Sequence, residues 1–165
     1  MFENLDIQEA IRRSMQTEKN AMDFYRRGAG CMRNEAARKT FELLAREERE
    51  HAEWFHRIYQ GGDIPDFDDF ISRQPHPESD WLRELDKIVA TDFTERKAME
   101  LAMEKELNLE KSLREIAAMI ADPQVRQVFE ANATSTRHHY ELIESEYARL
   151  MGMVHETDMN TYVRE

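Results

Sequence analysis

The chain repeats itself at an offset of 88 residues without a gap, and this repeat limits the folds that it can adopt. Phe41 corresponds to Phe129 under this offset, and His51 corresponds to His139. Apolar residues recur in steps of three and four in both copies, which is the spacing of one face of an α-helix. The sequence therefore predicts two copies of one helical unit.

The composition favours long helices in a single domain. There are only five glycines and four prolines in 165 residues, whereas a sheet would need more turn residues. A chain of this length can bury a core without disulfides. The single cysteine, Cys31, excludes an internal disulfide and a Cys-x-x-Cys metal knuckle. We expect an all-α fold in which residues 1–165 form one domain.

Helix-start and helix-stop residues divide the chain into four long helices. Asp6 and Thr94 are equivalent caps of the first helix in each copy, and Asn34 and Asp122 are equivalent caps of the second. Gly28-Ala29-Gly30 is predicted to end the first helix. The helices are expected at about 6–30, 34–60, 94–121 and 122–151, with a crossover at 61–93 that contains a short helix near 80–90. Short loops make each pair antiparallel, which predicts a four-helix bundle of two pseudo-symmetric helical hairpins.

Five ionisable residues occupy positions where the helical pattern calls for apolar side chains: Glu18, Glu48, His51, Glu106 and His139. A buried carboxylate without a partner is costly. At ~1.5 Å of rise per residue, all five are expected near mid-bundle, within a turn or two of one another. Carboxylate oxygen and imidazole nitrogen together suit iron, manganese or zinc. Taken singly, each residue could be an edge glutamate or a core histidine, but the joint pattern favours a metal site.

The repeat breaks down chemically at one position, where Thr136 stands opposite Glu48. Three other polar residues near the predicted site have two interpretations each. Tyr25 is a packed core residue, which is the favoured interpretation, or a hydrogen-bond donor to the site. His138 is a solvated residue or a replacement ligand. Asn132 anchors a water molecule or hydrogen-bonds within the polar centre.

Two segments, TEKNAMDFY (17–25) and FELLAREEREHAEWF (41–55), resemble the rubrerythrin-type di-iron proteins, which have a ferritin-like fold. The resemblance extends over nearly the whole chain. It implies a di-iron carboxylate site, with two iron ions expected and one as the alternative. Glu18, Glu48 and His51 would bind one iron, and Glu48 would bridge to a second iron bound by Glu106 and His139.

Rubrerythrins of this kind reduce hydrogen peroxide, and related proteins store or oxidise iron. The chain departs from the family pattern at Thr136, which replaces the second bridging glutamate, and at Leu109, where the family has another glutamate. It also lacks the cysteine pairs of a rubredoxin-type domain, so electrons would come from a separate protein. The resemblance thus leaves two functions open. One is a di-iron oxidoreductase acting on peroxide or dioxygen, and the other is a non-catalytic protein that binds one metal or has a structural role.

The net charge and the distribution of apolar residues bear on the partners and the location of the protein. The formal net charge of −11 disfavours nucleic acid and anionic membrane as partners. No apolar run approaches the ~20 residues that span a bilayer, and the first residues lack the apolar stretch of a secretory signal. We expect a cytoplasmic protein. Because helical hairpins often pair and crossovers can exchange between protomers, we also expect a homodimer.

Overall fold

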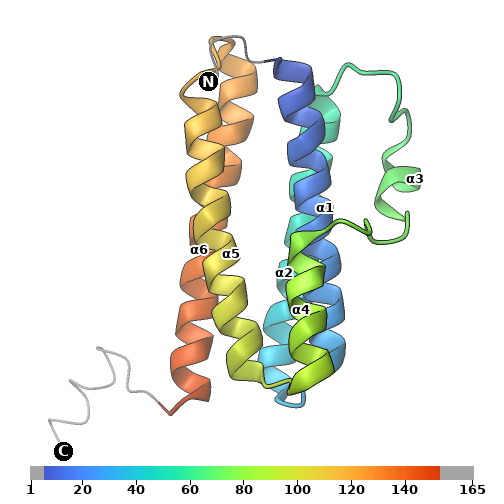
Figure 1. The fold of residues 1–165 in the computed structure, drawn as a ribbon. Helices are drawn as coiled ribbons and strands as arrows, with labels where there is room; N and C mark the ends of the chain where they lie inside the picture. Colours follow the sequence, from blue (N-terminus) through green and yellow to red (C-terminus); the bar gives the residue numbers. More distant parts are fainter. Residues whose placement is uncertain (1–5, 153–165) are drawn as a thin grey trace, which may run out of the picture.

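The fold, seen in a computed structural model that describes residues 6–152, consists of helices over that range (Figure 1). The helices are α1 (Ile7–Cys31), α2 (Glu35–Ile58), α3 (Phe67–Ile71), α4 (Asp80–Thr91), α5 (Glu95–Ala117) and α6 (Pro123–Leu150). α1 packs along α2 and α5 packs along α6, and the two hairpins meet mainly between α2 and α6. The predicted all-α bundle of two helical hairpins is confirmed.

The four long helices begin where the capping residues predict. The side chains of Asp6, Asn34, Thr94 and Asp122 each accept a hydrogen bond from a backbone N–H in the first turn of the helix that follows. These bonds satisfy donors that a helix start leaves without an intrahelical partner. Equivalent caps therefore start equivalent helices in the two hairpins.

One helix ends as predicted and another ends early. α1 ends at Cys31, within one residue of the predicted end at 30, and its last turn contains Gly28-Ala29-Gly30. Gly28 serves close packing, because a Cβ atom at this position would lie 2.8 Å from the ring of Phe41 on α2. α5 ends at Ala117, four residues before the predicted end at 121. The chain must leave the helical conformation before Pro123, because proline disfavours that conformation in the residue preceding it.

The crossover contains a short helix, α3, that the sequence did not predict. Its cap is Asp66, whose side chain accepts a hydrogen bond from the backbone N–H of Asp68 at 3.0 Å. Phe67, Phe70 and Ile71 are buried. Five residues are too few to show a helical period, so the run was indistinguishable from a loop.

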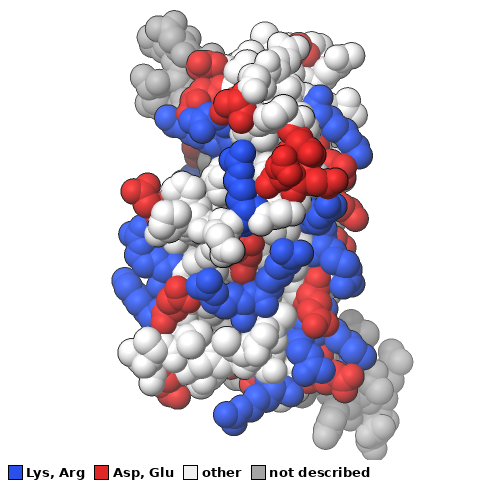
Figure 2. All heavy atoms as spheres, turned by 90° about the vertical axis from the view of Figure 1, so that its right-hand side faces the viewer, with Lys and Arg blue, Asp and Glu red and all other residues white. Residues whose placement is uncertain are grey.

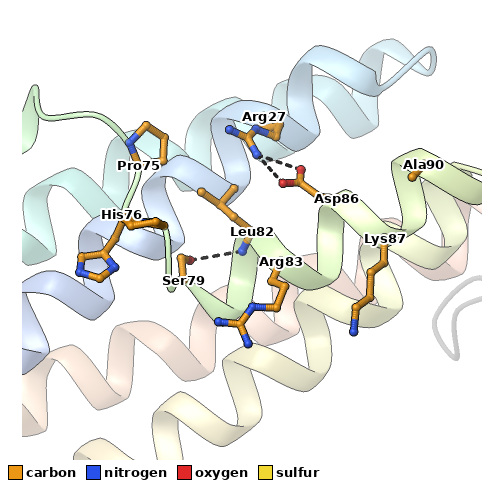
Figure 3. A pocket seen from close by; sticks show the side chains of 10 residues that line it. Arg27, Pro75, His76, Ser79, Leu82, Arg83, Asp86, Lys87 and Ala90 are labelled. Atoms are coloured by element: carbon orange, nitrogen blue, oxygen red, sulfur yellow. Dashed lines mark hydrogen bonds and ion pairs between the residues drawn. The ribbon is translucent and has the colours of Figure 1, made fainter.

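The second helix of the crossover, α4, lies against α1 and α5 (Figure 1). Ser79 caps it by accepting a hydrogen bond from the backbone N–H of Leu82 (Figure 3). Asp86 on its outer side forms an ion pair with Arg27 on α1 at 2.8 Å. Leu82 and Leu85 are buried on its inner side. α4 therefore connects the two hairpins and shields the side of the bundle where α1 faces α5.

A buried lysine of α1 forms an ion pair within its own helix and also binds the crossover. Lys19 Nζ lies 2.7 Å from Asp23 Oδ2, and both side chains are buried. The same ammonium donates to the backbone carbonyl of Gln74 at 3.5 Å. Breaking such a pair by removing one partner leaves an uncompensated buried charge, so Lys19 and Asp23 depend on each other.

The surface over the crossover carries charges of both signs. Figure 2 shows lysine and arginine interspersed with aspartate and glutamate on this face, despite the net charge of −11. Arg49 on α2 and Asp68 on α3 form one such exposed pair at 3.4 Å. None of the helices within residues 6–152 combines the length and the apolar character needed to cross a membrane.

Candidate metal centre

The five residues predicted to bind metal lie on four different helices and all of them are buried. Glu18 is on α1, Glu48 and His51 are on α2, Glu106 is on α5 and His139 is on α6. Each side chain is at most 2% exposed. The helices deliver these side chains to one level because equivalent caps start equivalent helices in the two hairpins.

Glu48 lies between the two histidines. Its Oε1 atom is 2.9 Å from His139 Nδ1 and 3.3 Å from His51 Nδ1. The imidazole rings are nearly parallel, with centroids 5.1 Å apart. Glu18 Oε2 lies 3.8 Å from His51 Nδ1, and Glu106 Oε1 lies 3.8 Å from His139 Nδ1. The centre thus has two halves, each with one histidine and one glutamate, which share the Glu48 carboxylate.

Aromatic layers flank this centre along the bundle. Glu48 lies seven residues after Phe41 and seven before Phe55 on α2, so each phenylalanine is about 10 Å away along the helix axis. Phe41 packs edge-to-face against Tyr25, and Phe55 packs against Phe129, with ring centroids 5.0 Å and 4.9 Å apart. These apolar layers limit the access of water from either end of the bundle.

Each histidine is also held through its other ring nitrogen. His51 Nε2 is 2.8 Å from Ser135 Oγ, and His139 Nε2 is 2.8 Å from Glu47 Oε1. A histidine that donates its Nε2–H in this way presents the lone pair of Nδ1 to the centre, as a metal ligand must. Sequence reasoning missed Glu47 and Ser135. The offset shows only that they occupy equivalent positions, because 135 − 47 = 88, and does not show that they contact the histidines.

Nine buried polar atoms of these residues and of two neighbours on α6 form no hydrogen bond within the described part of the chain. These buried atoms are both carboxylate oxygens of Glu18 and of Glu48, Nδ1 of His51 and of His139, Oε2 of Glu106, Oδ1 of Asn132 and Oγ1 of Thr136. The contacts of Glu48 with the imidazoles are short but are not aligned as hydrogen bonds. A group of orphaned buried acceptors is costly, and a divalent cation would satisfy it. The ligand atoms of Glu48, His51 and His139 already lie within 4.8 Å of one another.

A comparison with family models assigns the chain. The model described as Rubrerythrin matches residues 9–147. The chain belongs to the rubrerythrin family. Comparisons with curated proteins and with solved structures found no match. The centre described above therefore lies at the middle of a rubrerythrin-family bundle.

Burial and mutual contact strongly perturb the ionisation of this rubrerythrin-family centre. Burial and the nearby Glu48 carboxylate raise the pKa of Glu18 to about 8. Burial also opposes ionisation of Glu48, but its contacts with His139 and His51 hold its pKa well below the usual range. Burial works against charge on the imidazoles, yet the surrounding carboxylates raise the pKa of His51 to about 10 and of His139 to about 12. The metal-free centre therefore holds protons at neutral pH, and a metal ion must displace them.

The α6 side of the centre offers neutral groups where a carboxylate was expected from the repeat. Thr136 is fully buried. Asn132 donates from Nδ2 to the Val128 carbonyl at 2.9 Å, which leaves its Oδ1 atom without a partner. His138 is exposed, so the solvated interpretation holds. Leu109, where rubrerythrins have a further glutamate, is a buried apolar residue.

Tyr25 contacts the centre directly, and the favoured interpretation as core packing alone was incomplete. Its hydroxyl donates to Glu106 Oε1 at 2.6 Å, between α1 and α5. The ring is fully buried. Burial and the neighbouring carboxylate raise the pKa of Tyr25 well above its ordinary value, so the hydroxyl keeps its proton. Tyr25 thereby fixes Oε1 of Glu106, while Oε2 forms no hydrogen bond within the described residues.

Proposed function

We propose that this protein binds two iron ions between its four long helices and uses them to reduce hydrogen peroxide or dioxygen. Glu18, Glu48 and His51 would bind one ion, and Glu106 and His139 would bind the other, with Glu48 shared. The observation that carries the proposal is the position of Glu48 Oε1, which is within 3.3 Å of both Nδ1 atoms. Oxygen and nitrogen donors of this kind suit iron.

When bound, two ferrous ions supply the two electrons that convert hydrogen peroxide and two protons into two water molecules. The chain contributes the geometry and the environment. Ser135 and Glu47 orient the two imidazoles, and Tyr25 orients Glu106. The aromatic layers keep bulk water away, so the carboxylates interact with a cation in a weakly screening environment.

Repeated turnover would require a source of electrons. A separate electron-donor protein would re-reduce the iron, because the single cysteine cannot form a rubredoxin-type iron site. We also propose a homodimer. This follows from the helical-hairpin architecture, in which hairpins pair and crossovers can exchange between protomers. The cytoplasm, which keeps thiols reduced, is the proposed location.

A second candidate function is non-catalytic binding of a single metal ion. The neutral Thr136 and the apolar Leu109 favour it, because both reduce the negative charge available to a second ion. Glu18, Glu48 and His51 alone would then form the site. Manganese or zinc would suit these ligands as well as iron does.

Anaerobic loading with ferrous iron, removal of unbound metal and metal analysis test the proposal. We expect two ions per chain, and stoichiometric oxidation of the ferrous protein when peroxide is added. Glu48→Ala should abolish that oxidation, whereas Glu50→Gln, an exposed change on the same helix, should leave it intact. A chain that retains no metal refutes the proposal. One tightly bound ion without peroxide-dependent oxidation supports the single-metal function instead.

A further inference from the structure

The two hydrogen bonds to the outer histidine nitrogens are related by the internal repeat. The Ser135 bond runs from α6 to His51 on α2, and the Glu47 bond runs from α2 to His139 on α6. Both pairs follow the same offset, since 139 − 51 = 88 and 135 − 47 = 88. Equivalent bonds of the same length, 2.8 Å, thus come from a carboxylate on one side and from a hydroxyl on the other.

This difference matters for the charge of the centre. Glu18, Glu48 and Glu106 carry three negative charges when ionised, whereas two divalent cations carry four positive charges. Thr136, the equivalent of Glu48, contributes none. An uncompensated charge in a buried site is costly, so the second cation needs a fourth negative group near it.

Glu47 is the carboxylate placed to meet this need. It contacts His139, which lies in the same half of the centre as Thr136. Its side chain is 39% exposed, so its ionisation requires little loss of hydration. A carboxylate that accepts the Nε2–H of a histidine fixes the ring with Nδ1 toward the metal and makes that nitrogen a stronger donor. Ser135 can orient His51 but cannot supply charge.

We propose that Glu47 is a positioning residue that compensates, through His139, for the negative charge missing at Thr136, and that it thereby retains the second divalent ion. The inference rests on the proposed binding of two ions at this centre. It assigns Glu47 a role that Ser135, its equivalent in the repeat, does not have.

Titration of the metal-free protein with Co²⁺, followed by the absorption of the bound ion and by equilibrium dialysis, tests this role. We expect two ions in the unaltered protein. Glu47→Gln keeps the shape of the side chain and removes its charge. It should therefore weaken the binding of the second ion by about 10- to 100-fold and leave the binding of the first ion unchanged. Ser135→Ala should weaken binding less, and the exposed control Glu50→Gln should change nothing. Adding Thr136→Glu to Glu47→Gln should restore the second ion.

The outcomes separate this inference from the proposed function. A protein that binds no Co²⁺ overturns both. A protein that binds one ion overturns the role of Glu47 and leaves single-metal binding in place. Two ions of unchanged affinity in Glu47→Gln overturn the inference alone. Circular dichroism melts of each variant identify any variant that has lost its fold, and the Thr136→Glu rescue then decides, because a gain of binding cannot result from misfolding.

Discussion

Glu48→Gln should separate the metal-binding role of the centre from its contribution to the fold. Gln has nearly the same volume as Glu, so the aromatic layers formed by Phe41 and Phe55 should remain packed. The change removes the one carboxylate whose oxygen is within 3.3 Å of both histidine Nδ1 atoms. Because both halves of the centre share this group, we expect the binding of both ions to be weakened.

The size of the effect follows from linkage between binding and folding. A ligand at a free concentration one thousand times its dissociation constant stabilises the folded state by about 4 kcal/mol. In a domain of this length, 1 kcal/mol shifts the melting temperature by about 2–4 °C. Metal should therefore raise the melting temperature of the unaltered protein by roughly 8–16 °C, and most of that increase should disappear in Glu48→Gln.

The assay is a thermal melt of chelator-treated protein, with and without Mn²⁺, for the unaltered chain, for Glu48→Gln and for Glu50→Gln. Glu50 is exposed on the same helix, so its substitution controls for the loss of one charge from α2. A metal-dependent increase in Glu48→Gln equal to that of Glu50→Gln would refute the assignment of Glu48 as the shared ligand.

Two other predictions concern the metal-free protein. Tyr25→Phe should lower the free energy of unfolding in urea by about 1–3 kcal/mol, because the Glu106 oxygen loses its buried donor. The control Tyr140→Phe, which removes a longer hydrogen bond near the surface, should have little effect. Equal losses in the two variants would contradict a stabilising role of the Tyr25–Glu106 contact. The raised pKa values of Glu18 and His51, about 8 and about 10, mean that the folded state binds more protons than the unfolded state, so metal-free stability should fall as the pH rises from about 5 to about 10. Urea melts across this range measure it, and stability that rises with pH would contradict the burial of these groups.

The helices and the five central residues could be predicted because each depends on local spacing. Asp6 caps α1 through the first turn alone, and Glu48 and His51 share a face because they are three residues apart on one helix. Counting from the turns then placed Glu18 and Glu106 at a common level. These relations need only the rise of a helix and the symmetry of the repeat.

The contacts that were missed depend on how one hairpin is rotated against the other. Glu47 is adjacent to Glu48 on α2 and would be assigned to the helix surface from spacing alone. It reaches His139 because α2 and α6 are packed in contact, and no pattern within either helix gives that rotation. For Tyr25 the sequence offered a donor role as one of two interpretations, and packing between α1 and α5 selects Glu106 as its acceptor. Packing between helices, which patterns within single helices do not determine, selects these partners.

The two hairpins contribute unequal numbers of acidic residues to the centre. At the positions related by the repeat, α2 has Glu47 and Glu48 where α6 has Ser135 and Thr136. Glu48 contacts the histidines of both hairpins, and Glu47 contacts His139 of the opposite one. With Glu47 in the proposed role, α2 provides two carboxylates, whereas a symmetric repeat would take one from position 48 and one from position 136. A neutral residue at 136 is then compatible with a two-metal centre, provided that both acids of α2 are present.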